Sequence, residues 1–155
     1  MILRGAKRLQ LSEFWRGAGS RFLPFADAAT EEHARALYAR WFAGADAGQD
    51  FVAAVSATIA PQGVVHLGNG DTGNRRTLRR MFERIGSAIH DLQIQIDEVY
   101  FDGPRVIAPF SMSGIHRGRL GIYAPTGRAL PSTGLLLARA DEDGNAAEVW
   151  LYVAP

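Results

Sequence analysis

The chain has 155 residues, of which 47% are hydrophobic and 21% are charged, and its formal net charge is +1. This length suits one domain with a core of its own, and so small a net charge gives no overall field that would attract nucleic acid or an anionic membrane. The sequence has no cysteine, which excludes disulfides, thiolate catalysis and cysteine-ligated metal centres.

An N-terminal extension, residues 1–29, is predicted ahead of a single domain over residues 30–155. The extension is basic and aromatic, but it lacks the unbroken apolar core of a signal peptide. No apolar run in the chain approaches the ~20 residues of a membrane span, so none is expected. We expect the extension to pack its aromatic side chains on the domain or on a partner subunit; a membrane-surface or targeting segment is the alternative. The missing signals favour a cytoplasmic protein.

Three helices are predicted in the first part of the domain. Thr30 is a suitable N-cap, and an apolar face then repeats at helical spacing through Phe42. A second helix begins near Asp50 and is expected to end at Pro61. The third, Arg75–Ile89, has the clearest apolar stripe, and its other faces carry arginines 75, 76, 79, 80 and 84. We interpret these arginines as a solvated face; an anion-binding or nucleic-acid patch is the alternative.

From residue 92 the apolar period changes to two, which is typical of strands with one buried face. The alternation slips at Asp97-Glu98, which predicts a β-bulge and a bend in the sheet. A turn at residues 102–104 leads into a strand over Arg105–His116, in which Pro109 cannot donate to a strand ladder and marks an edge or another bulge. Further strands are predicted at residues 64–67, 128–139 and 146–153.

This order of elements predicts an α+β fold, with helices packed on one face of a curved antiparallel sheet. A sheet that wraps around helices is cone-shaped and leaves a central apolar pocket. In the last strand Val149, Leu151 and Val153 share one face, and Trp150 and Tyr152 share the other. We expect the first face to line the pocket.

Two glycine-rich motifs join the strand that ends at His116 to the next strand. Gly114-Ile115-His116-Arg117-Gly118 is followed by Pro125-Thr126-Gly127-Arg128. Together they resemble the Gly-Thr-His-x-Gly and Pro-Thr-Gly-Arg signature of the SnoaL-like polyketide cyclases, in the nuclear-transport-factor-like (ketosteroid-isomerase-like) superfamily. The resemblance extends from about residue 30 to residue 155 and implies the same cone-shaped fold, a cystatin-like α+β barrel. It also implies ring closure by an aldol reaction without metal or cofactor, and commonly a homodimer that pairs sheet to sheet.

Three residues are candidates for acid–base catalysis. His116 belongs to the signature and either faces the pocket or braces the glycine-rich crossing. His66 lies near the end of the first strand, where the superfamily often places pocket residues, or it is a hydrogen-bonded structural histidine. Asp91 is a further candidate, although capping or turning the backbone is its simpler role. No pair of residues has metal-ligand spacing, so no metal site is expected.

The resemblance also implies an acid–base set that this sequence lacks. The positions of a polar pair on the next-to-last strand are Gly134 and Leu136, and the position of a histidine on the last strand is Val149. The acid that follows the family's tryptophan is absent at both Leu151 and Ala154. We therefore expect an apolar pocket wall, and the predicted pocket residues are Tyr38, Leu136, Val149, Leu151 and Val153.

Three functions are compatible with these observations. The first is an enzyme of the cyclase, isomerase or dehydratase type that acts on a small hydrophobic carbonyl compound, with His116 or His66 as the base and a tyrosine hydroxyl as the donor. The second is a non-catalytic protein that binds a hydrophobic ligand in the same pocket. The third is a structural or interaction module whose pocket is filled by its own side chains. A homodimer is expected in each case, because large aromatics such as Trp150 and Tyr152 on an outer sheet face are typical interface anchors.

Overall fold

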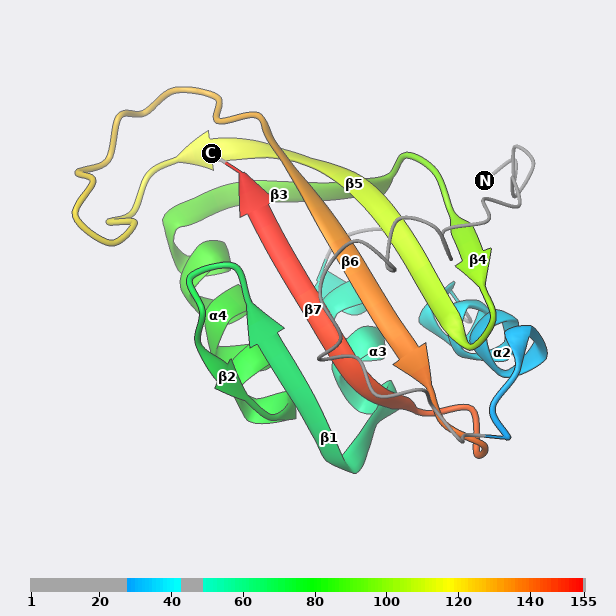
Figure 1. Ribbon diagram of the computed structural model, residues 1–155. Helices are drawn as coiled ribbons and strands as arrows, with labels where there is room; N and C mark the ends of the chain where they lie inside the picture. The colour runs from blue at the N-terminus through cyan, green and yellow to red at the C-terminus, as the bar shows by residue number, and fades with distance from the viewer. Residues whose placement is uncertain (1–27, 43–48, 155) are drawn as a thin grey trace.

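A curved sheet forms one layer of the molecule, and helices cover its concave face (Figure 1). The structure is a computed structural model that describes residues 28–42 and 49–154. The predicted N-terminal extension, residues 1–29, therefore lies outside the described residues except for its last two. The expected α+β class with a curved sheet is confirmed, and the sheet is open rather than a closed barrel.

The described residues form three helices and seven strands. The helices are α2 (Glu31–Phe42), α3 (Gln49–Thr58) and α4 (Arg75–Ala88). The strands are β1 (Ile59–Leu67), β2 (Thr72–Gly73), β3 (Ile89–Ile96), β4 (Tyr100–Asp102), β5 (Arg105–His116), β6 (Ser132–Ala140) and β7 (Ala146–Ala154). Within the described ranges, no helix is long and apolar enough to cross a bilayer.

The strands follow the order β2-β1-β7-β6-β5-β3, and β4 also pairs with β5. Consecutive long strands pair antiparallel, as expected, but β1 pairs with β7 in parallel. Parallel strands need a long connection, and here the whole of α4, β3, β4, β5 and β6 lies between the two partners. The four-residue strand predicted at residues 64–67 gave no indication of this direction.

The first strand is longer than the sequence predicts. Ile59 was expected in the second helix, but that helix ends at Thr58 and Ile59 already pairs with Ala146 of β7. The register of β1 shifts between Ile59 and Val64, so Pro61 lies in an irregular stretch of the strand. No ladder hydrogen bond needs a backbone N–H at this position, and proline is therefore tolerated. Proline therefore marks a bulge here rather than the end of the helix.

The predicted bulge near Asp97 is confirmed. Ile96 pairs with Phe110 and Tyr100 pairs with Ile107, so three residues, 97–99, face only two, 108–109. Pro109 lies at this point, as the sequence suggested, and its carbonyl accepts a hydrogen bond from the Asp97 N–H at 2.9 Å. Residues 97–99 thus separate β3 from β4, and both of these strands pair with β5.

The remaining boundaries agree with the predictions or differ from them by a few residues. Helix α4 begins one residue after Asn74, whose side chain accepts a hydrogen bond from the Arg76 N–H in a capping box with Thr77. Strand β6 begins at Ser132 rather than at Arg128, directly after Pro131. Strand β5 has the predicted bounds.

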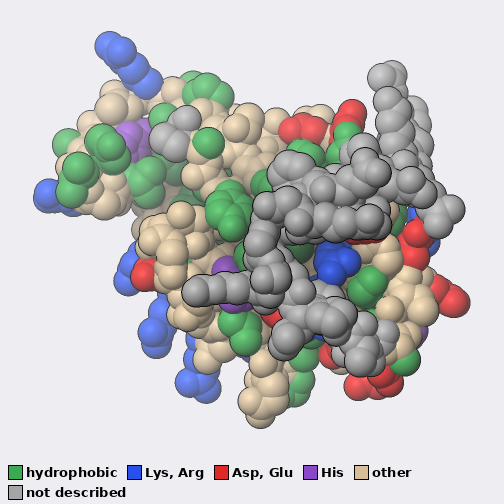
Figure 2. Space-filling model, in the orientation of Figure 1, with side chains coloured by type: hydrophobic (Ala, Val, Ile, Leu, Met, Phe, Trp, Pro, Cys, Tyr) green, Lys and Arg blue, Asp and Glu red, His purple; other side chains and the backbone are tan. Residues whose placement is uncertain are grey.

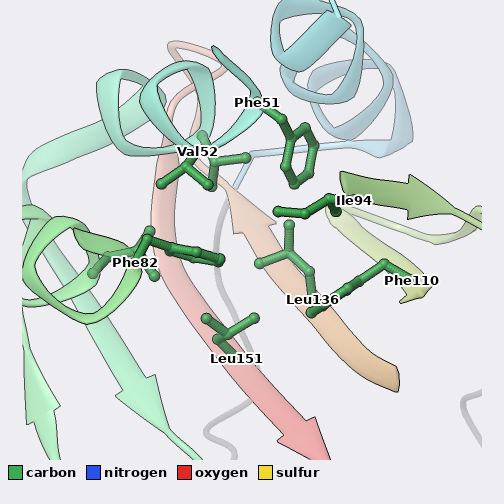
Figure 3. Close-up of a pocket in the computed structure, with 9 residues that line it drawn as sticks. Phe51, Val52, Phe82, Ile94, Phe110, Leu136 and Leu151 are labelled. Atoms are coloured by element: carbon green, nitrogen blue, oxygen red, sulfur yellow. The ribbon is translucent and has the colours of Figure 1, made fainter. Parts of the chain in front are cut away.

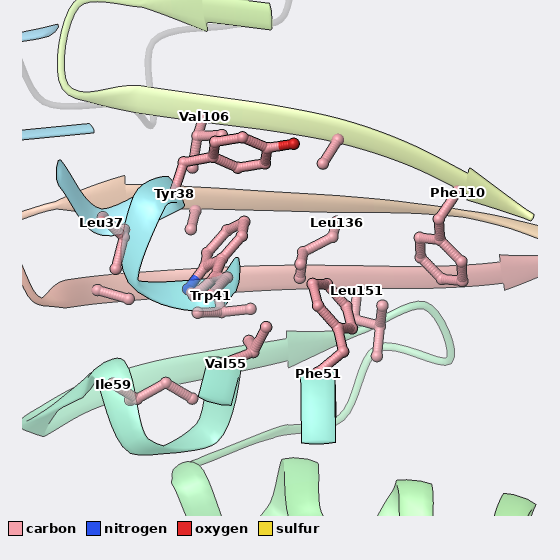
Figure 4. Close-up of a cluster of buried hydrophobic side chains, with 14 of the residues drawn as sticks. Leu37, Tyr38, Trp41, Phe51, Val55, Ile59, Val106, Phe110, Leu136 and Leu151 are labelled. Atoms are coloured by element: carbon pink, nitrogen blue, oxygen red, sulfur yellow. The ribbon is translucent and has the colours of Figure 1, made fainter. Parts of the chain in front are cut away.

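The core lies between the helices and the concave face of the sheet (Figure 4). Trp41 of α2 is fully buried at its centre, with its ring edge-on to the rings of Tyr38 and Phe51 at 5.9 and 6.3 Å. The indole N–H donates to the hydroxyl of Thr58 at 2.9 Å, and that hydroxyl donates to the Val55 carbonyl at 2.7 Å. One hydroxyl at the end of α3 therefore satisfies the buried polar atom of α2.

Replacement of Thr58 by valine removes this hydroxyl and leaves the Trp41 N–H buried without its partner. We expect Thr58→Val to lower the free energy of unfolding by about 1–3 kcal/mol, measured by urea denaturation. Thr58→Ser is the matched control, because it keeps the hydroxyl and loses one methyl group, which costs about 1 kcal/mol. Equal losses in the two variants would show that the hydrogen bond contributes nothing.

Candidate functional site

An apolar pocket lies between α3, α4 and the concave face of the sheet (Figure 3). Its cavity volume is about 10 Å³, which is the room that a single water molecule needs. The lining residues come from both helices and from four strands, and all are hydrophobic: Phe51, Val52, Val55, Leu78, Phe82, Ile94, Phe110, Leu136 and Leu151. The pocket has no ionisable group on its wall.

Two of these side chains are only half buried, Val52 on α3 and Phe82 on α4, whereas the other seven are buried. They come from the neighbouring helices α3 and α4, so the pocket wall is least buried between these two helices.

Gly134 of β6 shapes the wall next to the pocket. It pairs with Phe110 of β5, and the Phe110 ring lies across the space where a Cβ at position 134 would stand. The Tyr152 carbonyl would also come within 2.6 Å of that Cβ. A glycine at this position therefore lets the Phe110 ring lie flat against the sheet and form part of the pocket wall.

The five predicted pocket residues all belong to the inner side of the fold, but they do not line one space. Leu136 and Leu151 line the pocket. Val149 and Tyr38 are buried in the core cluster that includes Trp41, and Val153 packs against its edge. The aromatic lining from the helices, Phe51 and Phe82, was visible in the sequence only as inward-facing apolar residues.

His116 lies at the end of β5, on its inner face, and is 3% exposed. Its Nδ1 is 3.3 Å from the Thr126 hydroxyl, so the second half of the sequence signature contacts the first. Its Nε2 is buried and has no hydrogen-bond partner in the part of the chain that the structure describes. A buried ring nitrogen without a partner is costly, and such atoms are often found where a ligand binds.

His116 does not line the apolar pocket. Phe110 and His116 are six residues apart on β5, which corresponds to at most about 20 Å along the strand. By the alternation of a strand, Met112 and Gly114 are the inner-face residues between them. Only an elongated compound could lie in the pocket and reach His116.

His66 lies on the outer face of the sheet. Its ring stacks on Trp150 of β7, with centroids 5.0 Å apart and an interplanar angle of 13°. Its Nε2 is 3.1 Å from one oxygen of Glu148, and the other oxygen accepts a hydrogen bond from Arg139 at 3.1 Å. The structure thus places His66 and His116 on opposite faces of one sheet, where they cannot act on the same substrate atom.

Asp91 is exposed and lies in a second, unexpected bulge, where the β3 register shifts between His90 and Gln93. Its φ of 54° is the only positive value at a non-glycine residue among those described. Asp tolerates this left-handed conformation better than most residues, so Asp91 turns the backbone here. In the described part of the chain, no hydrogen bond or ion pair joins Asp91 to His66 or His116.

No three histidine, aspartate or glutamate side chains gather closely enough to hold a metal ion in residues 28–42 and 49–154. Burial raises the pKa of the Tyr38 hydroxyl above its ordinary value of 10.0. Tyr38 is therefore a neutral phenol at every physiological pH, as a hydrogen-bond donor has to be.

A family model of SnoaL-like polyketide cyclases matches residues 33–153. Among solved structures, a candidate SnoaL-like polyketide cyclase from Jannaschia sp. CCS1 is 14% identical, with a TM-score of 0.65 over 87% of this chain and 91% of that one. An NTF2-like protein from Burkholderia thailandensis is 20% identical, with a TM-score of 0.61 and coverage of 79% and 90%. IdmH, a candidate polyketide cyclase from Streptomyces antibioticus, is 22% identical, with a TM-score of 0.58 and coverage of 79% and 89%. At these identities the likeness establishes the fold. No relative was found among curated proteins.

The raised pKa of Tyr38 predicts a loss of stability at alkaline pH. The unfolded chain releases the phenol proton near pH 10.0 while the folded chain retains it, so this contribution is complete below that pH and is lost as pH rises through the folded pKa. In Tyr38→Phe the free energy of unfolding should fall less steeply above about pH 9 than in the wild type. Denaturant unfolding at a series of pH values measures this.

Tyr152→Phe is the control, since the Tyr152 side chain on the outer face is 47% exposed. This variant also loses one tyrosine hydroxyl, but from the surface, so it is the reference for the loss of a hydroxyl alone. Parallel curves for the wild type and Tyr38→Phe would contradict the assignment of a buried neutral phenol.

Proposed function

Because this chain belongs to the SnoaL-like polyketide cyclase family, we propose that it binds a small hydrophobic compound in the pocket between α3, α4 and the sheet. The observation that carries this proposal is the lining, which consists of nine apolar side chains and no ionisable one. A charged group of a ligand would lose its hydration there without gaining a partner, so the compound is uncharged where it contacts this wall.

The small size of the cavity does not oppose this function. Val52 and Phe82 are half buried at the edge of the pocket, and a Phe ring can move by side-chain rotation without breaking a backbone hydrogen bond. Binding then replaces contacts between Phe82 and its neighbours with contacts to the ligand. Burial of apolar ligand surface contributes roughly 25 cal/mol per Å², which suffices for a drug-sized apolar compound.

A larger side chain at the mouth should prevent binding. We expect Val52→Trp to weaken the binding of the neutral apolar dye phenylnaphthylamine about tenfold or more, because the indole fills the entry between α3 and α4. The dye's fluorescence rises when it leaves water, so a titration reports the dissociation constant.

Ala53→Trp is the matched control, because Ala53 is the next residue of α3 and is exposed. It adds the same indole outside the pocket and should leave the affinity unchanged. Phe82→Ala widens the mouth and should tighten binding. Equal affinities in Val52→Trp and the wild type would place the dye elsewhere and overturn the proposal.

A second candidate function is cofactor-independent acid–base catalysis on the bound compound. The observation that favours it is His116, whose Nε2 is buried without a partner on the inner face of β5. A base has to lie within hydrogen-bond distance of the proton it removes. The substrate would therefore be elongated, with an apolar end in the pocket and a carbonyl near His116. This role includes neither His66 on the outer face nor Asp91 in its bulge.

A test of this candidate needs no knowledge of the natural substrate. Ring opening of a nitrobenzisoxazole requires only a base: the base removes the ring C–H proton, the N–O bond breaks and a coloured cyanophenolate forms. We expect the protein to accelerate this reaction and His116→Gln to slow it about 100-fold, with dye affinity unchanged.

His90→Gln is the control for this measurement, because His90 is exposed on β3. Its rate should equal that of the wild type. A wild-type rate no higher than that of free imidazole, or an equal rate in His116→Gln, would leave binding as the function.

We also propose that two copies of the chain pair through their outer sheet faces. The exposed Tyr152 and Val64 and the Trp150 ring lie on this face. The His66 ring stacks on Trp150, and Glu148 forms ion pairs with His66 and Arg139. Apolar aromatic anchors with a polar rim are typical of an interface. Sedimentation of the purified chain reports its subunit number.

A further inference from the structure

The connection between β5 and β6, residues 117–131, projects from the body of the fold (Figure 1). Its tip carries Ile122 and Tyr123, which are 84% and 67% exposed and are the two most exposed large hydrophobic side chains in the described part of the chain. Single exposed apolar residues are common on protein surfaces, but two adjacent ones at the end of a projection form an apolar wedge.

The wedge is held in place by a tight turn. The N–H of Leu120 donates to the carbonyl of Tyr123 at 3.1 Å, and the N–H of Tyr123 donates back at 3.0 Å. Gly121 has a φ of 60°, which the first central position of a type II′ turn requires and which glycine adopts without strain. The backbone therefore points the two apolar side chains outward instead of letting them fold back on the protein.

The base of the connection is fastened to the domain on both sides. The N–H groups of Arg117 and Gly118 both donate to the Ala88 carbonyl at the end of α4, each at 2.9 Å. On the return, Gly127 N–H donates to the His116 carbonyl and Leu130 N–H donates to the Gly114 carbonyl, each at 2.8 Å. The projection is thus a supported element of the fold.

The charged side chains of the connection itself are all basic. Arg117, Arg119 and Arg128 are exposed on the connection, and the sequence has no Asp or Glu between residues 103 and 140. Figure 2 shows hydrophobic side chains gathered on the projection with Lys or Arg side chains beside them. Further blue side chains lie below, over the region of α4, whose exposed arginines include Arg84 near the anchored end.

We propose that residues 117–131 dock the protein on an anionic lipid surface. Ile122 and Tyr123 enter the headgroup region, where an aliphatic side chain and the amphipathic ring of tyrosine are both stable. The three arginines pair with lipid phosphates around them, as basic residues near an anionic leaflet do. A convex apolar tip inserts into a fluid surface, whereas an apolar groove suits a peptide, and nucleic acid offers no place for Ile122. The cytoplasmic leaflet, which is rich in anionic lipid, is the surface that this chemistry fits.

Vesicle flotation with the full-length protein tests the proposal. We expect binding to phosphatidylcholine vesicles that contain phosphatidylglycerol, and little binding to phosphatidylcholine alone. The double variant Ile122→Ser/Tyr123→Ser should bind the anionic vesicles at least about tenfold more weakly than the wild type does. Arg119→Gln should weaken binding about fivefold, since one basic residue near such a surface contributes about that factor, and added salt should weaken it further.

Two controls separate the wedge from other apolar surface. Ile122→Leu/Tyr123→Trp keeps the apolar character and should retain binding. Val64→Ser removes a large exposed hydrophobic side chain from the sheet instead and should bind like the wild type. Circular dichroism checks that each variant is folded; all of the changed side chains are exposed, so folding should be preserved.

Three results would overturn the proposal. Equal binding of the double serine variant and the wild type would assign membrane attachment to another segment. Equal binding to neutral and anionic vesicles would remove the role of the arginines. Binding of an RNA homopolymer that depends on the arginines but not on Ile122 and Tyr123, without vesicle binding, would identify a nucleic-acid surface instead.

Discussion

Eight consecutive residue pairs join β5 to β6 without a register shift, and the rest of the structure depends on this register. It places Val106, Ala108, Phe110 and Met112 on the face that the helices cover. A slip of one residue would turn Arg105, Pro109 and Ser111 toward the helices and would expose Phe110, because the side-chain period of a strand is two. The same register sets Gly134 opposite Phe110. The position of the Phe110 ring in the pocket wall therefore depends on how β5 and β6 pair.

The two faces of the sheet have different chemistry as a result. The inner face is apolar from Val149 to Phe110, and its one buried polar ring, His116, lies at the far end of β5. The outer face carries the chain of Arg139, Glu148 and His66 beside Trp150. We therefore propose the inner face as the site for an apolar compound and the outer face as the surface through which two copies of the chain pair. The connection after His116 belongs to neither face, and it presents apolar and basic side chains to a third environment.

Much of this arrangement follows from local sequence patterns. The bounds of β5, the bulge at Asp97 and the inward facing of Val149 and Leu151 were predicted, since each rests on a period of two over many residues or on a proline that cannot donate. The family resemblance rested on motifs whose two halves contact each other through His116 and Thr126.

Other features depend on tertiary contacts that no local pattern contains. Four residues around His66 predicted a strand. The parallel pairing of β1 with β7, some 80 residues away, determines that the His66 side chain lies on the outer face of the sheet. Ile59 was predicted in a helix but belongs to β1, because it pairs with Ala146. The second bulge, at Asp91, contains no proline or glycine from which it could have been predicted. The volume of the pocket depends on how the Phe51, Phe82 and Phe110 rings fill the space between α3, α4 and the sheet, which no local pattern determines.

The central claim is that a hydrophobic compound binds on the inner side of the sheet, between α3 and α4. An NMR titration of methyl-labelled protein with phenylnaphthylamine tests it most directly, because the methyl groups of Val, Leu and Ile lie on both faces. We expect shifts confined to the methyl groups that line the pocket, which are those of Val52, Val55, Leu78, Ile94, Leu136 and Leu151. Shifts at Val64 and Leu135 on the outer face with none at the inner methyl groups, or no saturable shift anywhere, would contradict it.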